Sequence, residues 1–168
     1  QGTHFRAGQS PVLNLKNPAG VSVQGQRRSL DLLKSLNQEH FALRQNESEL
    51  EARIESYELA FRMQAAARDV VDLSRESKKT HERYGLDNPR TEDFGRKCLI
   101  TKRLLERGVR YIQLYSGGGH IEDTWDGHTD CISNHKLHAA ETDRPMSALM
   151  QDMKDLGLWD ETLFVWGG

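Results

Sequence analysis

The order of sequence patterns in the second half of the chain constrains its fold more than any other feature. Residues 91–107 have a helical pattern that Thr91 can cap and Gly108 can end, and the β-branched and aromatic run "VRYIQLYS" follows directly. A glycine-rich loop, a second helical pattern at 134–157 and the apolar run "ETLFVW" complete the order. A crossover helix between two strands gives a parallel pair with a right-handed connection. The sequence therefore predicts an α/β fold with a parallel strand pair over 109–116 and 161–166.

The first ninety residues have a different pattern. Residues 1–21 hold scattered glycines and prolines and predict a loop-rich lead-in, and a helical pattern begins at about Ser22. The clearest helix starts at Asn46, where Glu49 completes a capping box, and a short polar helix follows that Gly85 ends. We expect a single incomplete domain over 1–168. Within it, 1–90 is a loop-rich lead-in and helical insertion or cover, and 91–168 is an α/β core segment.

The loop "GGGHIEDTWDGHTDCISNH" (117–135) gathers imidazoles and carboxylates in a stretch too rich in glycine for a helix. In the predicted sheet it leaves the carboxyl end of a strand, which is where open α/β folds bind ligands. Mixed nitrogen and oxygen ligands suit a hydrolytic metal better than a structural one, which prefers thiolates. Five residues of this loop are candidate metal ligands: His120, Asp126, His128, Asp130 and His135.

The same loop has less specific interpretations. Asp126 or Asp130 could cap the following helix, and the histidines could be solvated, as His135 and His138 would be if they share a solvent face. Cys131 could be a ligand or a nucleophile, and Ser116 could be a nucleophile beside His120. Trp125 could stack on a substrate ring or wall the site off from water. The spacing of the residues decides none of these alternatives.

Composition excludes some partners. The formal net charge is −2 and basic residues do not cluster, which argues against a nucleic-acid partner. No window approaches the length of apolar sequence that a membrane span needs. The oligomeric state is left open by the sequence.

Four stretches together resemble a large bacterial family of unknown function that is related to the sulfatases, within the alkaline phosphatase superfamily. They are "SELEARIESYELAFRMQ", "YGLDNPRTEDFGRKCLITKRLLERGVRYIQLYSGGG", "TWDGHTD" and "LGLWDETLFVWGG". The resemblance implies an α/β sandwich with metal ligands on strand-end loops, and it implies twin-arginine export, hence a periplasmic or extracellular location. It also implies that this chain resembles an internal segment of such a protein, which carries one ligand cluster of several. The resemblance narrows that cluster to Asp126 and His128 in "WDGH", with His120 and His135 as second candidates.

Two functions follow as hypotheses. The first is a metal-dependent hydrolase of sulfate or phosphate esters, with a divalent ion (zinc, manganese or calcium), a small-molecule or glycan ester as substrate, and part of the metal site on 117–135. Residues 1–168 alone are then expected to be inactive. The alternative is a non-catalytic binding or surface-structural protein on the same fold. A helical interaction module is a further alternative, because the first hundred residues are mostly amphipathic helix.

Overall fold

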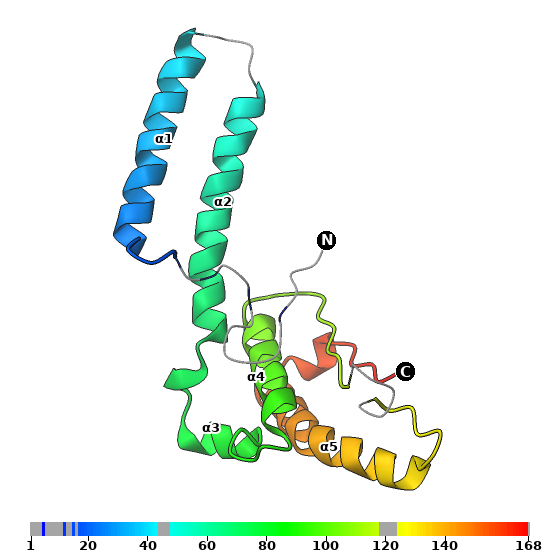
Figure 1. Cartoon of the computed structure of the whole chain (residues 1–168). Helices are drawn as coiled ribbons and strands as arrows, with labels where there is room; N and C mark the ends of the chain where they lie inside the picture. The colour runs from blue at the N-terminus through cyan, green and yellow to red at the C-terminus, as the bar shows by residue number, and fades with distance from the viewer. Residues whose placement is uncertain are drawn as a thin grey trace. The chain divides into compact units, whose positions relative to one another are not determined.

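A computed structural model describes Phe5, Val12, Leu15 and residues 17–43, 48–117 and 124–167. The chain divides into two compact units, Gln1–Asp72 and Leu73–Gly168. Figure 1 shows the elements of both units, which are α1 (Val23–Leu43), α2 (Ser48–Val71), the short 3-10 helix η1 (Leu73–Arg75), α3 (Lys78–Arg83), α4 (Glu92–Glu106), α5 (Cys131–Asp155) and the 3-10 helix η3 (Trp159–Glu161).

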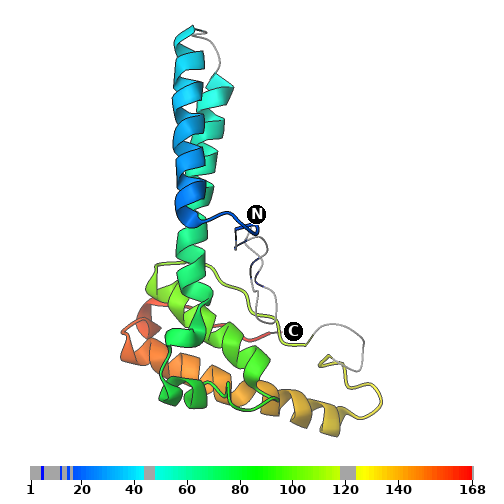
Figure 2. The same cartoon turned by 60° about the vertical axis from the view of Figure 1, so that its left-hand side comes forward.

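In the first unit, α1 and α2 form an antiparallel helical hairpin (Figures 1 and 2). Arg27 on α1 donates to Glu58 on α2 at 2.5 and 2.8 Å and to Asp31 one turn along its own helix. The hydrogen bonds to Glu58, and then those to Asp31, raise the pKa of the Arg27 guanidinium. Charge pairing between the helices therefore fixes their register. The predicted helix starts agree with α1 and α2, whereas Asn46 lies outside the described residues.

The second unit has its core between α4 and α5. Cys98 and Leu99 on α4 and Leu149 and Met153 on α5 are at most 1% exposed. Leu149 and Met153 are four residues apart and so share one face of α5, and the adjacent Cys98 and Leu99 are the buried residues of α4 that pack in the same core. Burial raises the pKa of the Cys98 thiol to about 12, which keeps it neutral in the core.

A buried polar contact joins the α3–α4 turn to α5. Tyr84 is fully buried, and its hydroxyl donates to Oδ2 of Asp152 at 2.7 Å, while Arg83 pairs with the other carboxylate oxygen. Gly95 lets α4 pass close to the Tyr84 backbone, because a Cβ there would lie 2.2 Å from the Tyr84 carbonyl oxygen. Gly85 turns the chain with φ +69°, as the sequence predicts for the end of α3.

The predicted α/β sandwich with a parallel strand pair is wrong. The described residues form helices and no strand, and 109–116 and 162–166 have no regular secondary structure. Side chains that neighbouring layers would cover in an α/β sandwich are exposed to solvent, with Tyr111 80% and Leu163 88% exposed. The β-branched and aromatic residues of these runs predicted strands. A strand also needs a neighbouring strand as hydrogen-bond partner, and composition does not show whether one is present.

One helix cap and one helix boundary differ from the predictions. Thr91 precedes α4 but makes no capping hydrogen bond with its side chain, because its hydroxyl donates to the Gly85 carbonyl at 2.5 Å. Helix α5 begins at Cys131 and continues through Pro145, where the sequence suggests a restart. Pro145 is fully buried, so its ring packs in the core of the unit although it removes one helical hydrogen bond.

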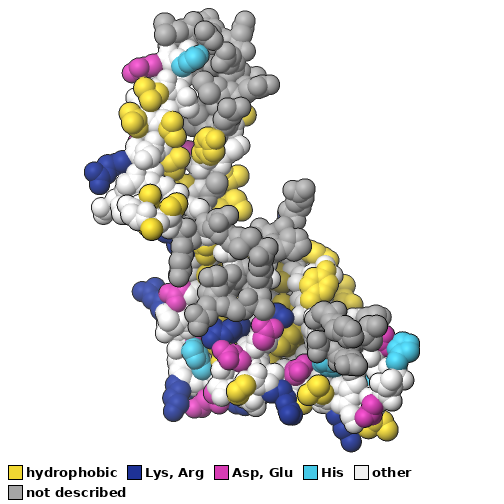
Figure 3. Space-filling model, viewed as in Figure 1, with side chains coloured by type: hydrophobic (Ala, Val, Ile, Leu, Met, Phe, Trp, Pro, Cys, Tyr) yellow, Lys and Arg dark blue, Asp and Glu magenta, His cyan; other side chains and the backbone are white. Residues whose placement is uncertain are grey.

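No helix in the described ranges is long and apolar enough to cross a membrane. Apolar side chains are nevertheless visible along the helical hairpin in Figure 3. Leu32 and Leu36 on α1 and Leu59 and Met63 on α2 are each more than half exposed.

Candidate functional site

The first turn of α5 positions the loop residues that the sequence singles out. Asp130 is the N-cap, and its side chain accepts from the Ser133 backbone N–H at 3.2 Å, which lowers the pKa of the Asp130 carboxyl. The capping interpretation is thus confirmed for Asp130. Asn134 also donates to the Thr124 carbonyl at 3.0 Å, so the loop is held to the helix at two points.

Gly127 lets the loop pass close to that helix. A Cβ on Gly127 would lie 2.7 Å from the Cα of Cys131, which is tighter than real side chains tolerate. The residues on either side of it, Asp126 and His128, are thereby placed together beside the start of α5.

Asp126 and His128 are in direct contact through Oδ1 and Nδ1. Their side chains are 46% and 81% exposed, and the Asp126 backbone N–H donates to Oγ1 of Thr124 at 3.2 Å. Since a carboxylate accepts hydrogen bonds, the Nδ1–H of the imidazole is the donor in this contact. The structure thus brings these two predicted residues together at the surface.

Of the other two predicted ligands, only His135 lies in the described part of the chain, and it does not join this pair. Nδ1 of His135 lies 2.8 Å from the Cys131 carbonyl oxygen and 3.0 Å from the Cys131 sulfur, so that ring turns back on its own helix. His120 lies outside the described residues. Over the part of the chain that the structure describes, no three His, Cys, Asp or Glu side chains converge as a metal site would require.

Trp125 is the centre of an aromatic cluster next to the pair. Its ring lies 5.3 Å from that of His138, 5.5 Å from that of Trp166 and 5.8 Å from that of His135, measured between ring centres. Its Nε1 donates to Oγ of Ser116 at 3.1 Å. Trp125 therefore links the extended segment after α4, the helix α5 and the end of the chain.

His138 was misjudged from the sequence. It is 4% exposed, not on a solvent face, and its Nδ1 lies 2.9 Å from Oε2 of Glu141, while its Nε2 has no partner among the described residues. The sequence signal that could have found this is the Glu141 carboxylate three residues on, which is within reach on the same helix.

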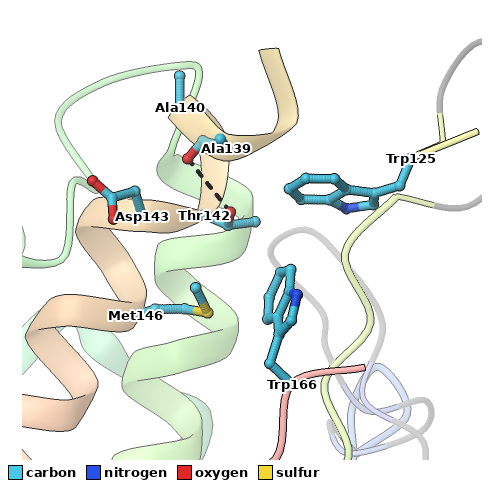
Figure 4. Close-up of a pocket in the computed structure, with 7 residues that line it drawn as sticks. All are labelled: Trp125, Ala139, Ala140, Thr142, Asp143, Met146 and Trp166. Carbon is cyan, nitrogen blue, oxygen red and sulfur yellow. Dashed lines mark hydrogen bonds between the residues drawn. The ribbon is translucent and has the colours of Figure 1, made fainter. Parts of the chain in front are cut away.

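A shallow pocket opens beside this cluster, with a volume of about 400 Å³. Figure 4 shows the indoles of Trp125 and Trp166 facing Thr142 and Met146 on α5, whereas Asp143 points away from them. Sequence reasoning placed Trp125 near a site but gave no role to Trp166, because forty residues separate the two in the chain.

These features define a helical unit with a surface-exposed carboxylate–imidazole pair and an aromatic pocket beside it. The chain belongs to the family described as "Protein of unknown function (DUF1501)", whose match covers residues 1–168. No curated protein and no solved structure matches the chain.

Proposed function

We propose that this protein is a metal-dependent hydrolase of sulfate or phosphate esters and that Asp126 and His128 belong to its metal site. The observation that carries the proposal is the direct contact of these two side chains on an exposed loop. The resemblance of "TWDGHTD" and the neighbouring motifs to sulfatase-related proteins of the alkaline phosphatase superfamily supports the same reaction class. Export to the periplasm or the cell exterior is part of this proposal and rests on that resemblance alone.

The donor set fits part of such a site. A carboxylate oxygen and an imidazole nitrogen are ligands that zinc and manganese accept, but a catalytic zinc site has three protein ligands. Asp126 and His128 supply at most two of them, and His120 is the remaining candidate on the loop, outside the described residues. A bound metal would lower the pKa of a water molecule and polarise the ester oxygen.

The residues of the chain have separable roles in this proposal. His128 would bind the metal through Nε2, because its Nδ1 is directed at Asp126. A carboxylate on the far nitrogen fixes the tautomer and orientation of a metal-binding imidazole and raises its basicity. Asp126 would thus position His128, and His128 would be the metal ligand of the pair. Gly127 and the Asp130 cap hold the pair beside α5.

The test is hydrolysis by the protein as its host produces it. A panel of sulfate and phosphate esters is assayed with the unmodified protein and with His128→Ala and Asp126→Asn, and metal content is measured in the same samples. We expect metal-dependent turnover that falls in both variants, and unchanged turnover in His40→Ala, which alters a histidine in the other unit. Full turnover in His128→Ala would contradict the proposal.

The second candidate is a non-catalytic binding protein. It is favoured by the aromatic pocket and by the small number of converging donors in the described ranges. A protein that retains metal and turns over no ester on the panel would favour this candidate.

A further inference from the structure

The pocket beside α5 is lined mainly by aromatic and apolar side chains, unlike the polar Asp126–His128 pair. Its walls are two indoles, Trp125 and Trp166, with Met146 and Thr142 opposite them (Figure 4). The indoles meet edge to face at 80°, with their centres 5.5 Å apart. Trp166 is 55% exposed, so a large part of its ring is open to an incoming group.

Two polar groups near the indoles are already paired, whereas Nε2 of His138, whose ring lies 5.3 Å from that of Trp125, has no partner among the described residues. The Trp125 N–H donates to Ser116 at 3.1 Å, and the Thr142 hydroxyl donates to the His138 carbonyl at 2.9 Å. The lining holds no basic residue, and its one charged residue, Asp143, points away from the indoles. An anion would therefore meet no cation in the lining.

We propose that this pocket binds a flat, uncharged aromatic group of a small molecule. Aromatic rings prefer offset or edge-to-face contact with one another, and the two indoles offer both a face and an edge to a ring placed against Met146. A thioether adds favourable contact with a ring edge. The two indole surfaces and the absence of a basic residue from the lining thus favour an aromatic group over an anion, and the sugar is a competing ligand in the test.

The pocket is a site separate from the Asp126–His128 pair, although Trp125 directly precedes Asp126 in the chain. No metal takes part in the binding proposed for it. The two proposals are therefore tested by different variants, and either can fail alone.

The test uses 2-naphthol as the probe, with decahydro-2-naphthol as a saturated probe of similar size and methyl galactoside as a sugar. Binding of each to the full chain is measured by calorimetry. We expect 2-naphthol to bind at least about fivefold more tightly than either of the others, because a stacked aromatic pair is worth about that factor beyond its buried area.

Variants assign the binding to the pocket. Trp166→Ala is expected to weaken 2-naphthol binding by about fivefold or more, and Trp166→Phe, which keeps a ring, to stay within about twofold. Trp159→Ala is the matched control, since Trp159 packs against Phe164 and Lys154 and does not line the pocket. Asp126→Asn and His128→Ala should leave binding unchanged.

Equal affinity for 2-naphthol and its saturated analogue would overturn the inference, as would undiminished binding in Trp166→Ala or tighter binding of the sugar. If His128→Ala loses no metal while 2-naphthol binds as expected, the hydrolase proposal fails and the aromatic site stands. If metal binding depends on His128 and 2-naphthol does not bind, the reverse holds.

Discussion

The Tyr84→Phe substitution tests the packing of the second unit most sharply, since it removes one oxygen atom from a fully buried ring. That oxygen donates to Asp152 at 2.7 Å, and Asp152 is itself 8% exposed and also pairs with Arg83. Burial raises the pKa of the Tyr84 phenol, so the hydroxyl remains a donor throughout the neutral range. The variant leaves a buried carboxylate with one partner fewer.

The magnitude follows from the charge of the acceptor. A hydrogen bond to a charged group contributes about 1.5–3 kcal/mol, so we expect Tyr84→Phe to lower the free energy of unfolding by about 2 kcal/mol. For a unit of this size that corresponds to a fall in Tm of roughly 8–16 °C. Asp152→Asn should cost at least as much, because it weakens the contacts with both Tyr84 and Arg83.

Urea unfolding followed by tryptophan emission measures this directly. The chain has three tryptophans, Trp125, Trp159 and Trp166, and all lie in the second unit, so the signal reports on that unit alone. Tyr115→Phe is the control, since Tyr115 is 65% exposed, and it should change stability by less than about 0.5 kcal/mol. A loss below about 0.5 kcal/mol in Tyr84→Phe would refute the argument from the buried carboxylate.

Other substitutions and conditions give further expectations. Gly95→Ala should destabilise the second unit despite alanine's better helix propensity, because its Cβ would lie 2.2 Å from a backbone oxygen; equal or greater stability in urea would show that α4 shifts freely. A thiol reagent at pH 8 should label exposed Cys131 and spare buried Cys98, and should label both in denaturant; two fast thiols in the native protein would contradict the packing. Because burial raises the pKa of Cys98 to about 12, the unfolded state loses the thiol proton at a lower pH than the folded state does. Unfolding free energy should therefore fall as pH rises from about 9 toward 12, and Cys98→Ala, compared over the same pH range, should lack this component.

The helices were largely predictable because their signals are local. Apolar spacing located α1, α2, α4 and the second half of α5, and the positive φ angles of Gly85 and Gly108 agree with the helix ends predicted there. The strands were not predictable in the same way. Runs such as 109–116 are rich in β-branched and aromatic residues, but strand formation depends on a partner distant in sequence. Pro145 suggested that the helix restarts there. Helix α5 instead continues through it, and the Pro145 ring is buried in the core of the second unit.

The metal-ligand role of the loop residues stays a prediction, while the structure shows how the described ones lie. Asp126 and His128 are two residues apart, so a single turn of loop could bring them into contact, and it does. His135 was a weaker candidate because its nitrogen is directed to its own helix, a feature that depends on where α5 begins. The role of Trp166 beside Trp125 is a tertiary contact, which a single sequence does not reveal.

The central claim is that His128, oriented by Asp126, binds a divalent metal. Zinc affinity of the chain, measured by competition with a chromophoric chelator at neutral pH, tests it most directly. We predict that His128→Ala and Asp126→Asn each weaken zinc binding by about 10–100-fold, as loss of a metal-binding imidazole or its orienting partner does, while His40→Ala binds as the unmodified chain. Zinc binding of equal strength in the unmodified chain and His128→Ala would contradict the account.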